Sequence, residues 1–367
     1  MNEVVNKKIE PLYTSVVSNI KERIDKSPFQ SSDFFYHNFK YESLFNKLNE
    51  KHKLYKDKVN YEEISKNIDY YYFIEKIKLL CSTIAHQRMV NVKYEIDFEG
   101  EINKFLEDIN LDEKPALQLY YMTYKVLKNE NDTDNFFNLK KNLLNNSAKI
   151  PTNELTEITV SAINFCTYKV NKGYTSFYTD YFDLIEFGLE NNLFITNGIF
   201  ETWRFNNFVI IAVRLGKFEW AENLIHKYKE YIKESERDSI VSFNLARLYY
   251  NQKRFYLVLD LLRNVEYSDL LINLNSKSLL LSTYYELNEY EMLDSFMESF
   301  RVYLNRHKDI SLQARKSFLN FIKFTRRLIR LTPGDKNAIQ KLRDDLQKEK
   351  SSTVNFEWLM EKITELE

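Results

Sequence analysis

The sequence predicts an all-α protein made of consecutive helical hairpins, and three observations lead to this prediction. Only six Gly and five Pro occur among 367 residues, far fewer than the turns of a β-rich chain of this length would need. Apolar residues recur with helical spacing over the C-terminal two thirds of the chain. Two stretches also repeat one order of helix, short polar turn with a single aromatic, and helix: "ARLYYNQKRFYLVLDLLRNV" (246–265) and "LSTYYELNEYEMLDSFMESF" (281–300).

The positions of the expected helices follow from this periodicity. The first 150 residues are less periodic, but 33–52, 61–92, 115–128 and 131–146 each look amphipathic. After them we expect four helix pairs: 151–170 with 173–191, 198–214 with 217–232, 236–250 with 254–264, and 269–286 with 289–305. A longer helix is expected at 310–331, followed by helices at 335–349 and 354–365.

An aromatic residue follows the polar turn of three successive hairpins and indicates their period. Phe218, Phe255 and Tyr290 are separated by 37 and 35 positions, close to the roughly 34 residues of a tetratricopeptide unit. Phe136 and Tyr174 are looser partners upstream. The residues six before, seven after and ten after each anchor are expected to pack facing helices together: Ala212, Tyr249 and Tyr284; Ile225, Leu262 and Met297; Tyr228, Val265 and Phe300.

The hairpins match a tetratricopeptide repeat in period and in the pattern of packing positions, and few residues are identical between them, so the repeats are degenerate. The small residue expected three positions after each anchor occurs only as Ala221, and Val258 and Leu293 take its place elsewhere. Because a single helical hairpin cannot bury its apolar face alone, neighbouring hairpins are expected to stack. The predicted fold is therefore a right-handed α-solenoid of degenerate tetratricopeptide-like helical hairpins.

No Ser/Gly-rich linker or block of charge divides the chain, which predicts a single continuous helical array over 1–367. Within that array we expect divergent N-terminal helices at 1–150, tetratricopeptide-like hairpins at 151–350 and a C-terminal capping helix at 351–367.

Several stretches resemble a family of uncharacterised bacterial tetratricopeptide-like helical proteins. They are "YYFIEKIKLLC", "RLGKFEWAENLIHKYKEYI", "FNLARLYYNQKRF", "LDLLRNVEYSDLLINLNSKSLLLSTYYELNEYEMLDSFMESFRVYLNRHK" and "WLMEKITEL". The resemblance covers nearly the whole chain and implies a helical solenoid. It implies no catalytic residues.

Charge and cysteine content limit the kinds of partner and compartment. A net charge of −1 gives no global field that would steer the chain to nucleic acid or membrane. Cys81 and Cys166 lie far apart and form no CxxC pair, so we expect buried thiols in a reducing compartment. The first twenty residues contain no continuous apolar stretch typical of a signal peptide, and no apolar run approaches the roughly 18 residues of a membrane span. We therefore expect a cytoplasmic protein without a membrane partner.

Motifs for catalysis are absent from the sequence. It contains no GxxxxGK[ST], GxSxG, HExxH or GxGxxG, so we expect no enzyme activity and no cofactor. Cys81 and His86 would be about 140° apart around a helix, which predicts that they do not meet. We expect a buried thiol and a partly exposed imidazole.

The stretch "EIDFEG" (95–100) imitates the start of a calcium-binding EF-hand loop, with alternate acids followed by Gly100. The pattern then fails, because Glu95 stands where Asp is wanted and Leu106 stands where a bidentate Glu is needed. We expect a short extended connection with one buried face and no metal.

The strongest local anomaly is positive charge. Nine Lys and Arg residues face one Asp between 301 and 330, a net charge of +8. On a helix of 100° per residue, Lys316, Lys323, Arg327 and Arg330 form a stripe opposite an apolar stripe. Like charges four residues apart repel one another, so something should offset the cost. The candidates are an acidic neighbour, either "RDDLQKE" (343–349) or the terminal "EKITELE", and an external anion such as an acidic partner segment or nucleic-acid phosphate.

These observations favour a non-catalytic protein–protein interaction scaffold of unknown pathway, with Tyr and Asn side chains along its inner helices. The alternative is nucleic-acid or polyanion binding through the basic helix 310–330. Its expected contact residues are Arg315, Lys316, Lys323, Arg326, Arg327 and Arg330.

Overall fold

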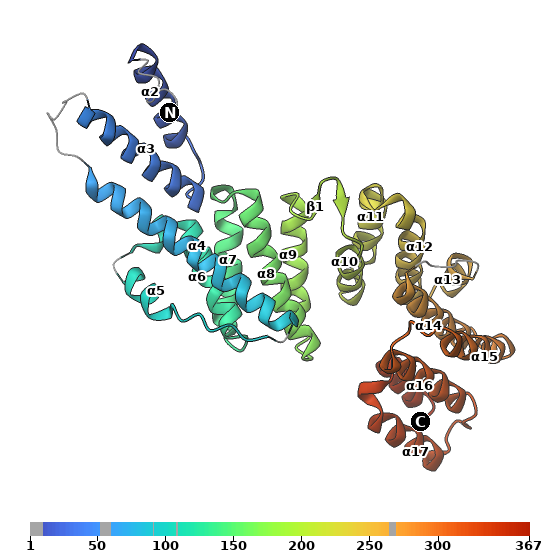
Figure 1. The fold of residues 1–367 in the computed structure, drawn as a ribbon. Helices are drawn as coiled ribbons and strands as arrows, with labels where there is room; N and C mark the ends of the chain where they lie inside the picture. Colours follow the sequence, from blue (N-terminus) through green and yellow to red (C-terminus); the bar gives the residue numbers. More distant parts are fainter. Residues whose placement is uncertain (1–9, 52–59, 91, 108, 264–268) are drawn as a thin grey trace. The chain divides into compact units, whose positions relative to one another are not determined.

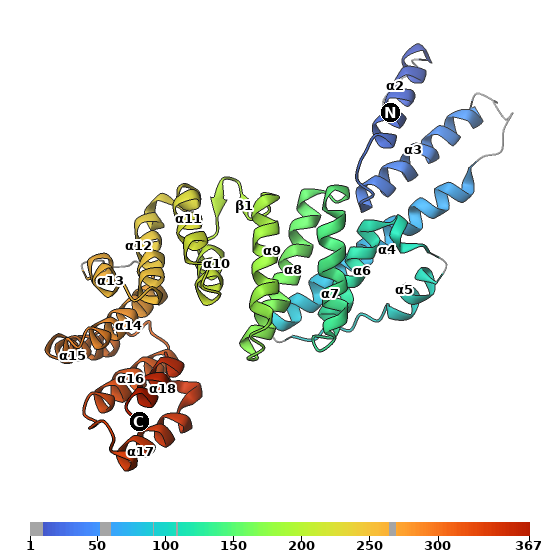
Figure 2. The same ribbon diagram turned by 180° about the vertical axis from the view of Figure 1, so that it is seen from behind.

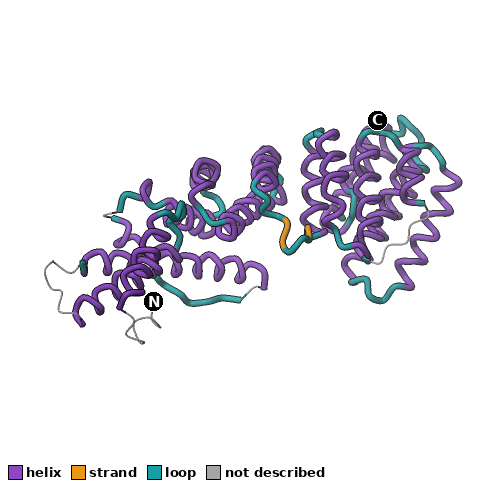
Figure 3. The backbone as a smooth tube through the Cα atoms, turned by 90° about the horizontal axis from the view of Figure 1, so that it is seen from above, coloured by secondary structure: helices purple, strands orange, loops and turns teal. Residues whose placement is uncertain are grey.

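The structure is a computed structural model that describes residues 10–51, 60–90, 92–107, 109–263 and 269–367 (Figures 1 and 3). The described chain is helical almost throughout, with two strands of two residues each, so the predicted all-α class is confirmed. The chain forms two compact units, Met1–Thr196 and Asn197–Glu367. The predicted single array depends on how these units combine, and it stays a prediction.

The first unit stacks helices in hairpin order. Helix α4 packs on α6, and α6 packs on α8, while α7 and α9 are the second helices of the hairpins that α6 and α8 begin. Figure 1 shows α6 to α9 side by side, and Figure 2 shows the same from behind. The elements are α2 (Glu10–Asp25), α3 (Ser32–Lys51), α4 (Tyr61–Val90), α5 (Glu99–Leu106), η1 (Leu111–Glu113), α6 (Pro115–Lys128), α7 (Thr133–Asn146), η2 (Ser147–Lys149), α8 (Thr152–Asn171), α9 (Phe177–Glu190) and β1 (Ile195–Thr196).

Aromatic rings fill the core between the hairpins of the first unit. The rings of Phe136 and Phe165 stack with centroids 4.6 Å apart, and Phe177 lies within 6 Å of both. Lys169 is buried beside this cluster, with its ammonium 5.3 Å from the Phe165 centroid and 5.8 Å from that of Phe177. These rings join α7, α8 and α9, so each hairpin completes the core of its neighbour.

The second unit repeats the same arrangement. Its first helices α10, α12 and α14 pack on one another in succession, and α11, α13 and α15 follow them as second helices. Every helix pair predicted in this unit is present, with ends within four residues of those expected. The elements are β2 (Ile199–Phe200), α10 (Thr202–Arg214), α11 (Phe218–Tyr228), η3 (Lys229–Tyr231), α12 (Glu234–Asn251), α13 (Phe255–Leu262), α14 (Leu270–Glu286), α15 (Tyr290–Arg306), α16 (Leu312–Leu328), α17 (Lys336–Lys348), η4 (Lys350–Ser352) and α18 (Phe356–Glu365).

One turn closes all three hairpins of the second unit. A residue with left-handed backbone ends the first helix, at φ +69° for Gly216, φ 59° for Lys253 and φ 58° for Asn288. The next N–H donates back to the carbonyl five residues earlier, at 2.9–3.0 Å, in the manner of a Schellman motif. The three bonds are Lys217 to Ala212, Arg254 to Tyr249, and Glu289 to Tyr284. The predicted anchor aromatic is then the first residue of the second helix each time.

The predicted packing positions are mostly buried. Ala212 and Tyr284 are buried before the turn, while Tyr249 is half-buried and donates its hydroxyl hydrogen bond to Glu222 at 3.0 Å. Val265 lies outside the described residues. The remaining positions are all buried: Ala221, Val258 and Leu293; Ile225, Leu262 and Met297; Tyr228 and Phe300.

The upstream anchors do not fit the same position. Tyr174 is 56% exposed in the turn before α9, whereas Phe136 is fully buried inside α7, past its first turn. The turn before α9 carries two extra residues between its left-handed Gly173 and the start of the helix, so the aromatic no longer begins that helix.

The hairpin of β1 and β2 was not expected from the sequence. Asn197 (φ 52°) and Gly198 (φ 77°) both adopt the left-handed conformation, as a two-residue type I′ turn requires. The Asn-Gly dipeptide between "FIT" and "IF" is the signal for it.

The last helix is tied to α14 by one carboxylate. The Trp358 indole N–H donates to Glu286 Oε1 at 2.8 Å, and the Lys362 ammonium lies 3.0 Å from the same atom. Lys362 is 7% exposed, and its hydrogen-bonded carboxylates raise its pKa against the opposing effect of burial. Residues 72 and 76 positions apart are thereby held together.

We expect substitutions at the left-handed position to change stability in opposite directions. Gly216→Ala should lower the free energy of unfolding by about 1 kcal/mol, since no atom crowds the added Cβ and only backbone strain remains. Lys253→Gly should raise it by a similar amount, because Gly adopts this backbone without strain. Denaturant titration of both variants measures the change, and two shifts of the same sign would contradict the assignment.

Candidate functional site

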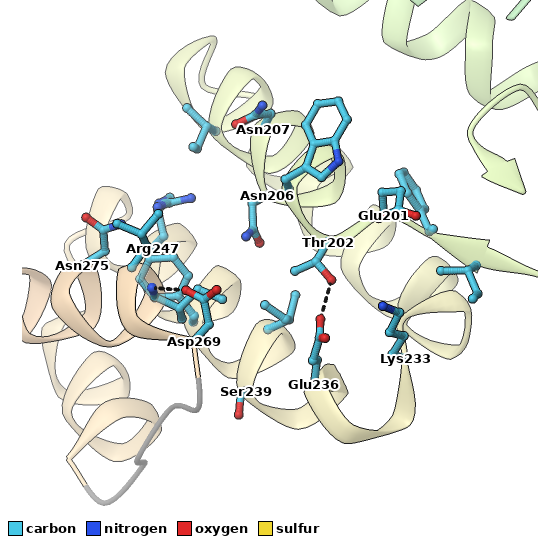
Figure 4. A pocket seen from close by; sticks show the side chains of 18 residues that line it. Glu201, Thr202, Asn206, Asn207, Lys233, Glu236, Ser239, Arg247, Asp269 and Asn275 are labelled. Carbon is cyan, nitrogen blue, oxygen red and sulfur yellow. Dashed lines mark hydrogen bonds between the residues drawn. The ribbon is translucent and has the colours of Figure 1, made fainter. Parts of the chain in front are cut away.

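A groove of about 630 Å³ crosses the first helices of the second unit (Figure 4). Its walls come from α10, α12 and α14 and from the segment that precedes α10. These three helices line one surface because each packs on the next, and equivalent positions of successive hairpins therefore face the same space.

The groove has an exposed apolar wall. Trp203 is 55% exposed and Leu271 is 64% exposed, while the adjoining Phe200, Ile240 and Phe243 are buried beneath. Exposed large apolar side chains gathered in one concave site are typical of ligand-binding surfaces.

Asparagines supply the polar groups of the groove. The buried Asn244 amide donates to the Asn206 Oδ1 atom at 2.6 Å and to the Ile240 carbonyl at 2.8 Å. The Asn206 oxygen is thus engaged, which leaves its Nδ2 hydrogens for the groove. Asn207 and Asn275 also line the groove, in agreement with the expected asparagines, whereas none of its described lining residues is a Tyr.

Arg247 on α12 is the most unusual group in the groove. Its Nη1 atom is buried without a hydrogen-bond partner among the described residues, although the side chain as a whole is partly exposed. The guanidinium lies 4.5 Å from the centroid of the Phe243 ring, which contributes a cation–π contact. Burial, reinforced by the nearby charge of Arg214, lowers the pKa of Arg247 to about 10. The groove therefore holds a desolvated cation that lacks a counter-ion in the described chain.

Two of the three acidic residues that line the groove are committed to structural contacts. Glu236 accepts a hydrogen bond from the Thr202 hydroxyl at 2.8 Å. Asp269 caps α14 by accepting from the Ile272 N–H at 2.8 Å. None of the described lining residues is Cys or His.

The predicted basic stripe runs along α16 to Arg330, just beyond the helix, and two of its four residues form ion pairs with described residues. Lys316 lies 3.1 Å from Glu349, and Arg327 lies 2.9 Å from Asp345. Arg327 holds the pKa of Asp345 below its ordinary value, and hydrogen bonds from Ser352 and Lys316 do the same for Glu349. The acidic neighbour 343–349 thus offsets part of the charge.

The other four basic residues divide into two groups. Arg326 approaches Asp294 and Glu298 on α15 at 3.7 and 3.8 Å, and Arg315 donates to the carbonyls of His307 and Ile310. Lys323 and Arg330 are exposed and form no ion pair with described residues. Three of the six predicted residues thus pair with acids, Arg315 is held by carbonyls, and Lys323 and Arg330 have no acidic partner in the described chain. Glu367 of the terminal segment pairs with Arg343 instead.

The remaining sequence candidates do not form a site. Cys81 and Cys166 are buried as expected, and burial raises the pKa of the Cys81 thiol to about 12. His86 is exposed and hydrogen-bonded to the Tyr94 hydroxyl at 3.0 Å. Within the described ranges, no group of three or more His, Cys, Asp or Glu could hold a metal ion.

The segment around Gly100 differs from the expected connection. The extended part before α5 buries only Phe98, and Ile96 is exposed, so it does not have the predicted buried face. Gly100 itself lies within the first turn of α5. Among the described residues, no helix is long and apolar enough to span a membrane.

Comparison with known proteins gives no match. No family model, curated protein or solved structure is similar to this chain.

We expect replacement of Arg247 by Met to stabilise the free protein. A cation whose pKa falls on folding destabilises the folded state at every pH below the folded pKa, and the cost is relieved as pH rises above about 10. Removing it should raise the free energy of unfolding at pH 7 by about 1–3 kcal/mol. Denaturant titration tests this, with exposed Arg263→Met as a control expected to change little. A less stable Arg247→Met protein would contradict the proposed cost.

We expect the basic residues of α16 to differ in their effect on stability. Arg327→Glu places a second carboxylate against Asp345 and should lower the melting temperature at neutral pH, whereas Lys323→Glu should leave it unchanged. The difference should shrink in 0.5 M salt because exposed charges are screened. Equal losses for both variants would show that Lys323 also has an internal partner.

Proposed function

We propose that this protein is a non-catalytic interaction module that holds an extended segment of a partner protein in the groove of α10, α12 and α14. The period of 35–37 residues and the recurring turn support a tetratricopeptide-like repeat, for which we also propose the right-handed stacking of such hairpins. A cytoplasmic location stays a prediction, based on the two buried thiols.

The observation that carries this proposal is the combination of unused groups in one groove. Trp203 and Leu271 are exposed there, and Arg247 keeps a buried donor unsatisfied. The unsatisfied donor costs stability in the free chain, and exposed apolar side chains gathered in a groove are typical of binding surfaces. An extended peptide would cover the apolar side chains and offer backbone carbonyls to the asparagines.

Nucleic-acid or polyanion binding through α16 has weaker support. Lys323 and Arg330 favour it, since they have no acidic partner among the described residues. Lys316, Arg326 and Arg327 would have to leave their internal carboxylates to contact phosphates. With two free cations the log–log salt slope on duplex DNA should not exceed about −2, at roughly −0.9 per neutralised phosphate.

The test is selection of displayed random peptides on the full-length chain, followed by titration of individual peptides against variants. We expect selected peptides to bind the wild type and to lose at least about tenfold in affinity on Trp203→Ala/Leu271→Ala, since each side chain contributes roughly 1–3 kcal/mol when covered. Tyr256→Ala on α13 is the control, because Tyr256 is 69% exposed outside the groove.

The double variant Lys323→Glu/Arg330→Glu separates the two proposals. Groove binding requires this variant to keep wild-type affinity. Peptides that bind the Trp203→Ala/Leu271→Ala chain normally but are lost with the charge reversal would overturn the groove proposal and favour α16.

A further inference from the structure

We infer that the partner segment carries an acidic side chain, Asp or Glu, whose carboxylate binds between Arg247 and Asn206. This inference rests on the proposed function, because it names the chemistry of the segment that the groove would hold. Figure 4 shows both side chains reaching into the groove from neighbouring helices, Arg247 from α12 and Asn206 from α10.

The groove presents an unsatisfied donor at this point, and a second cation that is not among the lining residues acts on it. The Nη1 atom of Arg247 is buried and has no hydrogen-bond partner in the described chain. Phe243 covers one face of the guanidinium, so a ligand approaches its edge, where the N–H groups lie. Arg214 adds a second positive charge that acts on Arg247. An anionic acceptor would satisfy the donor and reduce the repulsion between the two cations.

Asn206 adds a donor whose orientation is fixed by a hydrogen bond from the buried Asn244. Its oxygen accepts from the Asn244 amide, whose other hydrogen goes to the Ile240 carbonyl, so neither amide is free to turn over. The Asn206 Nδ2 group therefore faces outward as a donor. Two donors that line the same groove match the two oxygens of a carboxylate better than a single carbonyl.

The acids of the groove restrict where the ligand's charge can lie. Glu201, Glu236 and Lys233 lie on the opposite side of the groove from Arg247 in Figure 4. Asp269 is on the same side as Arg247, but its carboxylate caps α14 and has no ion pair with Arg247. A ligand carboxylate is thus favoured at Arg247 over the opposite side, where two acids flank the single cation Lys233, and we expect one acidic residue in a segment that is otherwise apolar or neutral.

The test uses two pools of random nonapeptides, acetylated and amidated, that differ only in Glu or Gln at the central position. Immobilised full-length protein is incubated with both pools, which carry different isotopic labels, and the bound fractions are read by mass spectrometry. We expect the Glu pool to be retained at least about tenfold better, as for a charge-assisted hydrogen bond to a desolvated cation. Arg247→Gln should abolish that preference, Arg247→Lys should keep part of it, and Arg263→Gln should keep all of it.

The outcomes distinguish this inference from the proposed function. Equal retention of the two pools, with loss of both on Trp203→Ala/Leu271→Ala, would leave the groove as a peptide site and overturn the acidic specificity. A third pool has a central Gln and a free C-terminus. It tests whether the peptide's C-terminal carboxylate, instead of an acidic side chain, binds at Arg247. Retention of that pool alone would also overturn the side-chain inference. Retention of no pool would count against the groove itself, provided that circular dichroism shows a folded chain.

Discussion

The contact of each first helix with the next first helix is the constraint on which the second unit depends. Helices α10, α12 and α14 touch in succession, and this is possible because the same left-handed turn returns the chain after each of them. Gly216, Lys253 and Asn288 differ in side chain but share the left-handed backbone conformation. The packing of the helices therefore determines this conformation, and the residue type only changes its free-energy cost. The regular direction of the second helices follows from this.

The groove is a product of the same stacking. Three equivalent helix faces meet there, and they bring together an apolar pair, a fixed amide and an unpaired guanidinium. The cations of α16 differ from Arg247, because most of them form ion pairs with carboxylates on α15, on α17 or in the turn after α17. Of the two basic features, Arg247 with its buried and unpaired Nη1 atom should gain more from an anionic ligand than the stripe, since an exposed paired charge contributes little.

Much of the fold could be predicted from the sequence, and much of the site could not. Helical periodicity and polar turns predicted the hairpins of the second unit, because both signals depend on residues that are close together in the sequence. The Asn-Gly dipeptide also indicates a turn, but the strands on either side of it are too short to show the alternation of apolar and polar residues that predicts a strand. Arg247 looks like any other arginine of an amphipathic helix, since burial without a partner arises only when α10 and α14 cover it. The stripe on α16 was visible, but the acids that neutralise it come from other helices.

The contact of Glu286 with Trp358 and Lys362 gives the end of the described chain an influence far from it in sequence. Because this carboxylate on α14 is bound by two residues of α18, we expect the two helices to unfold together. Loss of α18 would leave that carboxylate and the apolar face beneath Trp358 exposed at the edge of the hairpin that supplies Leu271 and Asn275 to the groove. A helix that contributes no residue to the groove therefore supports the helix that forms one of its walls.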